Sequence, residues 1–365
     1  MALTARSTRL AELTVTFPGM IFALATRFAS AAERERCCHL IEQGKPLKQA
    51  AEALGLPLWL RKLPPEAFCV PLSHVPAGSD FSRRIVALIP ENPDSGTELA
   101  PWLQRVLLAA EACHDEFAIW MARHRRWPVS VRSDERLAML AAWAWHADRP
   151  DTLGYKIVRY GWMPQMSLKR ALEEARVWER RIELAFILKS ASRIVWLDGA
   201  EVNGFQFVPL DRIEDFLAES ASMNNCLDQY ADQLVTGSNR VYSIRLQGRR
   251  VADVEIGGHP DDCTVPAILQ LRGPSNRRAG PQIWRAAYRW IGSQPAKNAK
   301  LVLSQAAARA ARNQLREELW GPYLKALAER CGSGRVAALL LNRDGLTRRR
   351  GQIAGETLQE ALTVG

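Results

Sequence analysis

The spacing of hydrophobic residues changes along this chain from a helical period to a strand period and back to a helical one. In the first half, apolar residues recur at helical spacing, which predicts helices. These helices are expected over residues 20–42, 45–55, 102–125, 134–146 and 167–188. Ser167 is the expected N-cap of the last helix, and Gly55 the expected end of the second.

From residue 193 onward, short runs of alternating apolar and polar residues predict strands. The runs cover residues 193–197, 205–208, 240–247, 251–256 and 268–272, with helical patterns over 210–223 and 226–234. After Pro281 the helical period returns through residue 290 and again over 306–330. Helices, then hairpins with helices, then helices again predict an α+β fold rather than a parallel sheet with crossover helices.

The expected organisation is a small central antiparallel sheet with helices, placed between mostly helical N- and C-terminal regions. A stretch rich in proline, glycine and serine over residues 90–96 marks an expected boundary. The expected regions are an N-terminal helical region (1–90), a second helical region (97–190), a central α+β core (191–280), a basic helical region (281–350) and a tail (351–365).

The two central strands predict a hairpin whose register follows from the positions of its apolar residues. A two-residue turn at Gly248–Arg249 would place apolar residues opposite polar ones, whereas a three-residue loop, Gly248–Arg250, keeps each kind on its own face. The loop pairs Ile244 with Val254, Arg245 with Asp253, and Ser243 with Glu255. The three-residue loop is therefore the predicted connection.

Alternation along the three strands collects polar side chains on one face of the sheet. These are Ser243, Arg245, Asp253, Glu255, Gln270 and Arg272. One interpretation is the solvated face of an antiparallel sheet. The other is a binding or catalytic surface on which Arg245 and Arg272 hold an anion and Glu255 acts as a base.

Several segments of the central region carry a family resemblance. They are MNNCLDQY (223–230), Gly237, VYSIR (241–245), VEI (254–256), LQLRG (269–273) and Asn276, with LGLPLWLRKLPPEAF (54–68) nearer the N-terminus. Together they resemble the PcfJ-like family of bacterial proteins associated with conjugative plasmids and other mobile elements. The resemblance implies a mobile element or genomic island as the context, and it brings no established activity.

One position departs from that family pattern, which often has a histidine directly before the cysteine. Here Asn225 stands before Cys226, so a histidine–cysteine nucleophile pair is missing. A thiol near a helix N-terminus could still be reactive, and Cys226, Tyr230 and Glu255 are the candidate catalytic residues. The alternative is that Cys226 is a small buried packing residue.

The formal net charge of +10 is concentrated in the final quarter of the chain. Residues 272–350 contain 17 Lys and Arg but 4 Asp and Glu, whereas residues 1–271 contain 32 and 33. An excess of positive charge of this size favours an anionic partner.

Arginines recur at helical spacing inside this basic segment. Arg285 and Arg289 share one helix face, beside a stripe of Trp284, Tyr288 and Ile291 that is expected to be buried. A second set on one helix face consists of Arg309, Arg312 and Arg316. Three more arginines, Arg348, Arg349 and Arg350, lie in an expected tail. Such stripes can contact nucleic-acid phosphates, or they can be ordinary solvated helix faces.

Other motifs point to no metal or cofactor. The chain has no P-loop, no dinucleotide-binding glycine motif and no nucleophile-elbow motif. Cys37-Cys38-His39 has no second pair at ligand spacing. Residues 48–55 resemble the start of a helix-turn-helix, but the prolines of 56–65 do not suit a recognition helix.

Seven scattered cysteines suggest reduced thiols, and no apolar run is long enough to span a membrane, so a cytoplasmic bacterial protein is expected. Three functions follow as hypotheses. The first is a nucleic-acid-associated protein of a mobile element, and the second an enzyme with its site on the polar sheet face. The third is a non-catalytic scaffold whose N-terminal helices bind a protein partner.

Overall fold

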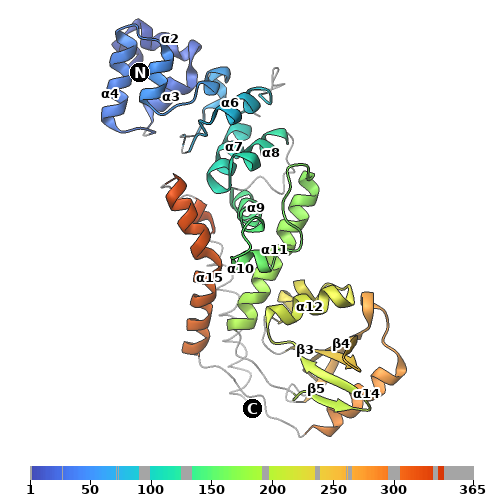
Figure 1. Ribbon diagram of the computed structural model, residues 1–365. Helices are drawn as coiled ribbons and strands as arrows, with labels where there is room; N and C mark the ends of the chain where they lie inside the picture. Colours follow the sequence, from blue (N-terminus) through green and yellow to red (C-terminus); the bar gives the residue numbers. More distant parts are fainter. Residues whose placement is uncertain are drawn as a thin grey trace. The chain divides into compact units, whose positions relative to one another are not determined.

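The computed structural model describes most of the chain as two compact units. The described residues are 2–26, 28–70, 72, 74–89, 99–124, 134–190, 197–234, 239–259, 261, 265–294, 305–331 and 336–340. One unit comprises Met1–Pro150, Tyr160–Leu172 and Tyr323–Leu341, and the other comprises Asp151–Arg159, Glu173–Pro322 and Asn342–Gly365. Figure 1 shows the elements of both.

The first unit is helical throughout its described part. Its elements are α1 Ala2–Arg6, α2 Thr8–Thr16, α3 Pro18–Ala25, α4 Ala31–Glu42, α5 Leu47–Ala53, η1 Leu58–Lys62, η2 Pro65–Ala67, α6 Ser79–Val86, α7 Leu99–Ala112, α8 Asp115–Arg123 and α9 Asp134–Ala147. The end of α15 (Gln305–Cys331) also belongs to it, because Tyr323 donates a 2.6 Å hydrogen bond to the Ala112 carbonyl and contacts the Trp145 ring. Aromatic burial thus ties α15 to α7 and α9.

Two helices predicted as continuous are each broken in the structure. The first ends at Ala25 and a new helix begins at Ala31, where Ser30 and Glu33 form a capping box. The second breaks at His114, whose extended backbone starts α8 and whose Nδ1 accepts from the Phe117 amide. In both places an N-cap satisfies amides that a continuous helix would bond internally. Apolar spacing alone does not reveal such a cap.

Other predicted helix limits are confirmed. α9 covers the predicted 134–146 segment, and α11 (Leu168–Ser190) begins directly after Ser167, whose hydroxyl accepts from the Arg170 amide. Gly55 follows α5 with a positive φ of 66°, the left-handed conformation that glycine adopts without strain.

The second unit contains a five-stranded antiparallel sheet in the order β1-β2-β3-β4-β5. Its elements are α10 Leu153–Lys156, β1 Ala200–Val202, β2 Phe205–Pro209, α12 Ile213–Met223, η4 Leu227–Gln229, α13 Ala231–Leu234, β3 Arg240–Leu246, β4 Arg249–Gly258, β5 Pro266–Arg272, η5 Pro274–Asn276 and α14 Pro281–Ser293, with parts of α11 and α15. The α+β prediction is confirmed. Residues 193–196 of the first predicted strand lie outside the described residues, and the first described strand, β1, covers Ala200–Val202.

The predicted three-residue hairpin loop is wrong. β3 and β4 are joined by a two-residue turn of Gln247 and Gly248, both with positive φ, and Ser243 pairs with Asp253 rather than Glu255. A β-bulge at Val251 adds one residue to β4. A two-residue turn plus one bulged residue keeps the same parity as a three-residue loop. The apolar and polar residues therefore stay on the predicted faces although their partners change.

The apolar face of the sheet packs against α14. Trp290 stacks on Phe207 with ring centroids 4.3 Å apart and meets the Tyr242 ring edge-on at 4.8 Å. Ala286 and Ala287 complete the buried helix face. Tyr288, predicted to be buried, is instead 63% exposed, because the turn that faces the sheet is centred on Ala286, Ala287 and Trp290. In Figure 1, α12 and α14 lie on opposite sides of the strands.

Candidate functional site

The polar face of the sheet is not a solvated surface, because α12 and the turn after it cover its middle. Ser243 and Glu219 are fully buried, and Asp253 and Glu255 are 6% and 8% exposed. The strand pairs Ser243–Asp253 and Val241–Glu255 place both acids next to β3, with Arg272 and Gln270 opposite them on β5. The interpretation of this face as a solvated one is therefore wrong for its central residues.

A buried acidic pair occupies the centre of this face. The Glu219 carboxylate on α12 accepts from the Ser243 hydroxyl at 2.7 Å and from Arg250 Nε at 2.7 Å. Asp253 on β4 lies beside it. Burial first, and then the charge of Glu219, raise the pKa of Asp253 to about 8. Both effects favour the protonated form of Asp253.

A proton on Asp253 would satisfy the hydrogen bonding of its buried carboxyl group. Asp253 Oδ2 accepts from the Asn225 side-chain amide at 2.7 Å, whereas Oδ1 is buried and accepts from no donor among the described residues. An ionised Asp253 would leave this oxygen unsatisfied, at a cost of about 1–3 kcal/mol or more. A protonated Asp253 can instead donate to Glu219, so the two carboxyl groups form an acid–carboxylate pair.

Asn225 is positioned by the end of α12. Asn224 closes the helix in the left-handed conformation, with a φ of 50°, and the Asn225 amide bonds to the Ser220 carbonyl at 3.3 Å. The Asn225 carbonyl in turn accepts from the Ser220 hydroxyl at 2.6 Å. Thus Asn225, directly before Cys226, holds the turn after α12 and binds Asp253.

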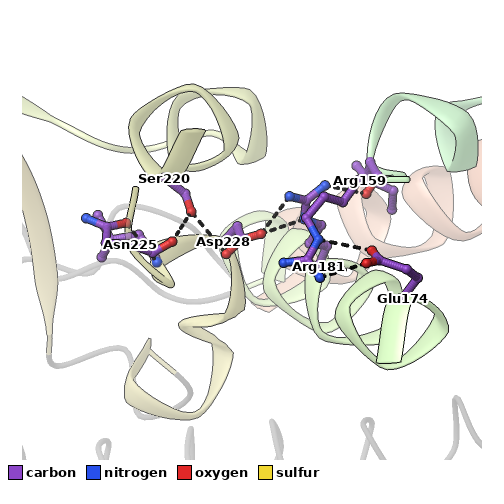
Figure 2. A network of polar contacts seen from close by, with 8 residues as sticks. Arg159, Glu174, Arg181, Ser220, Asn225 and Asp228 are labelled. Atoms are coloured by element: carbon purple, nitrogen blue, oxygen red, sulfur yellow. Dashed lines mark hydrogen bonds and ion pairs between the residues drawn. The ribbon is translucent and has the colours of Figure 1, made fainter. Parts of the chain in front are cut away.

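A second polar network continues from Ser220 to α11 (Figure 2). Arg181 donates through Nε and Nη2 to Asp228 at 2.8 and 2.6 Å, and through Nη1 to the Ile157 carbonyl at 2.9 Å. Ser220 also lies 3.1 Å from Asp228. Arg159 binds Glu174 through two 3.0 Å hydrogen bonds. Every charge in this network is paired, which indicates that it fixes α11 against the turn after α12.

The structure brings two of the three predicted catalytic residues into direct contact. Tyr230 donates to Glu255 at 2.5 Å, and Glu255 also accepts from the Asn239 amide at 2.6 Å. Burial, and then the bond to Glu255, raise the pKa of Tyr230 above its usual range. Cys226 is exposed, so the interpretation of Cys226 as a buried packing residue is wrong.

The two arginines predicted to hold an anion on this face do not join that group. Arg245 is half-buried, donates to the Ser243 hydroxyl at 3.3 Å, and pairs across the sheet with Gln206 and Arg250. Arg272 is exposed at the end of β5. A cavity of about 150 Å³ in this unit is lined by different residues, including Ile157, Phe186 and Leu315. Cys226, Arg245, Glu255 and Arg272 are absent from its lining.

The predicted basic residues fall into two groups. On α14, Arg285 and Arg289 are exposed, and Arg289 donates to the Asn203 side chain at 3.0 Å. On α15, Arg309 is exposed, whereas Arg316 is half-buried and Arg312 lies half-buried over the Phe186 ring at 5.9 Å. The α15 arginines are therefore partly used in packing, and Arg348, Arg349 and Arg350 lie outside the described residues.

Two further basic residues were missed by the search for helical stripes. Arg277 and Arg278 are exposed in the connection between β5 and α14, and Arg278 forms an isolated bridge with Arg272. Composition could have revealed them, because residues 272–294 contain five arginines and no acidic residue. The positive charge of residues 272–294 is therefore not balanced by any acidic residue within the same stretch.

No family model, no curated protein and no solved structure matches this chain. Within the described ranges, no helix combines the length and the apolar character needed to cross a membrane. His, Cys, Asp and Glu residues in the same ranges form no group of three or more suited to a metal ion. The resemblance to the PcfJ-like family stays a prediction.

Proposed function

We propose that this chain is a nucleic-acid-associated protein of a bacterial mobile element, and that its second unit binds the phosphate backbone. The observation that supports binding is the exposed surface formed by Arg285 and Arg289 of α14, in a stretch with no acidic residue. Arg272, Arg277 and Arg278 extend the positive charge toward β5. The mobile-element context rests on the family resemblance alone.

The physical reason is counterion release. An exposed arginine without an acidic neighbour keeps its full charge for an external phosphate, and each phosphate contact releases counterions from the nucleic acid. The guanidinium group also binds phosphate with two parallel hydrogen bonds. Arg285 and Arg289 are four residues apart, about 6 Å along the helix axis, so one strand can contact both.

The test is binding of a fluorescent oligonucleotide, measured by anisotropy, at about 50 and about 200 mM salt. The R285E/R289E double variant should bind more weakly and lower the slope of log affinity against log salt by about 2. R36E/R176E changes the net charge equally at exposed positions of α4 and α11 and should bind as the wild type does. Absence of binding at low salt, or equal loss in both variants, refutes the proposal.

A second candidate function is an enzyme that uses the exposed Cys226 thiol beside the Tyr230–Glu255 pair. The short phenol–carboxylate contact favours it, because Tyr230 can pass a proton between Glu255 and a group bound near the thiol. Cys226 should react with iodoacetamide at a rate that changes in Y230F, as measured by peptide mass spectrometry. Exposed Cys69 is the internal reference, and an unchanged rate at Cys226 excludes the coupling.

The scaffold hypothesis gains no specific support. Among the described residues of the N-terminal unit, exposed apolar side chains such as Val15, Leu58 and Val86 lie on different helices. An extended apolar patch would be needed to favour a protein partner.

A further inference from the structure

We infer that the ligand of the α14 surface is a single-stranded nucleic acid, one base of which stacks on Tyr288. This inference rests on the proposed function and names the kind of nucleic acid. The α14 surface consists of Trp284, Arg285, Tyr288 and Arg289. An exposed aromatic ring beside two exposed arginines is the observation that distinguishes a single strand from a duplex.

Helix geometry makes these four residues neighbours. Trp284 and Tyr288 are four residues apart, as are Arg285 and Arg289, so an aromatic row lies beside an arginine row. The rings of Trp284 and Tyr288 contact each other, with centroids 5.7 Å apart and planes inclined by 31°. Trp284 is partly buried at the edge of the sheet core, so it supports the Tyr288 ring from one side.

Tyr288 itself faces solvent. Its exposed fraction is 63%, the largest among the exposed tyrosines of the chain's described part. A large ring left in water gains nothing for folding, whereas stacking a nucleic-acid base on such a ring is worth about 1–3 kcal/mol. The bases of a duplex are already stacked on each other inside the helix, so only an unpaired base can reach Tyr288 without first being unstacked.

The arginines fit the same ligand. Arg285 and Arg289 form one row beside the Tyr288 ring, so the phosphates of a strand that follows this row can meet both guanidinium groups while one base stacks on the ring. Stacking and phosphate contacts do not distinguish the sugar. The ligand chemistry is therefore a flexible single strand, with DNA and RNA as two separate arms of the test.

The experiment measures anisotropy of four labelled probes of about 20 nucleotides: oligo(dT), oligo(U), oligo(dA) and the dT–dA duplex, all at about 50 mM salt. The full-length wild type should bind at least one pyrimidine strand more tightly than the duplex. Tyr288→Ala should weaken that binding by about 5- to 100-fold and change duplex binding by less than about twofold. Tyr288→Phe, which keeps the ring, should bind as the wild type does.

Different failures separate the two proposals. Duplex binding equal to or tighter than single-strand binding, or equal losses for both ligands in Tyr288→Ala, overturns the stacking inference while phosphate binding stands. Binding of none of the four probes overturns the proposed function as well. Far-UV circular dichroism of each variant checks the fold, which should be unaffected because the Tyr288 side chain is exposed.

Discussion

Replacing Asp253 by asparagine should make the stability of the second unit nearly independent of pH between 6 and 9. In the wild type, the folded-state pKa of Asp253 is raised from 3.8 to about 8. The folded protein then binds a proton that the unfolded chain has released, and the free energy of unfolding falls as pH rises from about 4 to 8. Below this range the stabilisation is complete, and above it the stabilisation is lost.

The size of the effect follows from the raised pKa. Each unit of pKa difference corresponds to about 1.36 kcal/mol, so the loss between pH 6 and pH 9 is about 3 kcal/mol. That is a large part of the 5–15 kcal/mol typical of a folded domain. In Asp253→Asn, the side-chain oxygen still accepts from Asn225 and the amide can donate to Glu219. The variant therefore keeps both contacts without a group that titrates.

The assay is urea unfolding at pH 6 and pH 9, followed by circular dichroism, with hydrogen exchange of the β3 and β4 amides to assign the transition to the sheet. Asp261→Asn is the control because the Asp261 side chain is 92% exposed. Comparing variants in the same buffers cancels the titration of other groups. If wild type and Asp253→Asn lose the same free energy between the two pH values, the reasoning about the acidic pair is refuted.

Three further predictions concern the sheet unit. Trp290→Ala should lower the free energy of unfolding by about 3–5 kcal/mol, measured by urea denaturation, because Trp290 is fully buried against the sheet. A loss below about 1 kcal/mol would contradict the packing of Trp290 on the sheet. Arg181→Met should lower the free energy of unfolding by about 3–5 kcal/mol, because it leaves the Asp228 carboxylate buried and unpaired. Adding Asp228→Asn should recover part of that loss. If the losses of the two single variants simply add in the double variant, the pairing is contradicted. Gln247→Asn should raise the free energy of unfolding by about 0.5–1 kcal/mol, because Gln247 has a φ of 50° in a turn type that favours Asn-Gly. Thermal unfolding measures the change, and a lower melting temperature would contradict the assigned turn.

Much of the fold could be predicted because apolar periodicity reports directly on which side of an element is buried. The strands β3, β4 and β5 were found within a few residues of their limits, and the parity of apolar positions assigned Ser243 and Asp253 to the correct face. The cross-strand partners were not predictable in the same way. A turn with one bulged residue and a three-residue loop satisfy the same parity, so only the hydrogen bonding of the folded hairpin distinguishes them.

The candidate site depended more on long-range contacts. Nothing in the spacing of Glu219 and Asp253 indicates that they meet, since they are far apart in the sequence and join only when α12 lies on the sheet. The same docking buries Ser243 and raises the pKa of Asp253. For Tyr288 the periodicity was misleading, because a helix carrying two tryptophans, a tyrosine and two isoleucines has more apolar residues than one face can bury.

By itself, the sequence determined the α+β class, the location of strands β2 to β5, the two faces of the sheet and the concentration of positive charge after residue 271. These properties are local, and each follows from residue type and spacing. Tertiary structure alone decided that α12 covers the polar face, that burial beside Glu219 raises the pKa of Asp253, and that Tyr288 stands exposed beside Arg285 and Arg289. Burial and electrostatic interaction depend on which distant segments meet, and that information is absent from any single stretch of the chain.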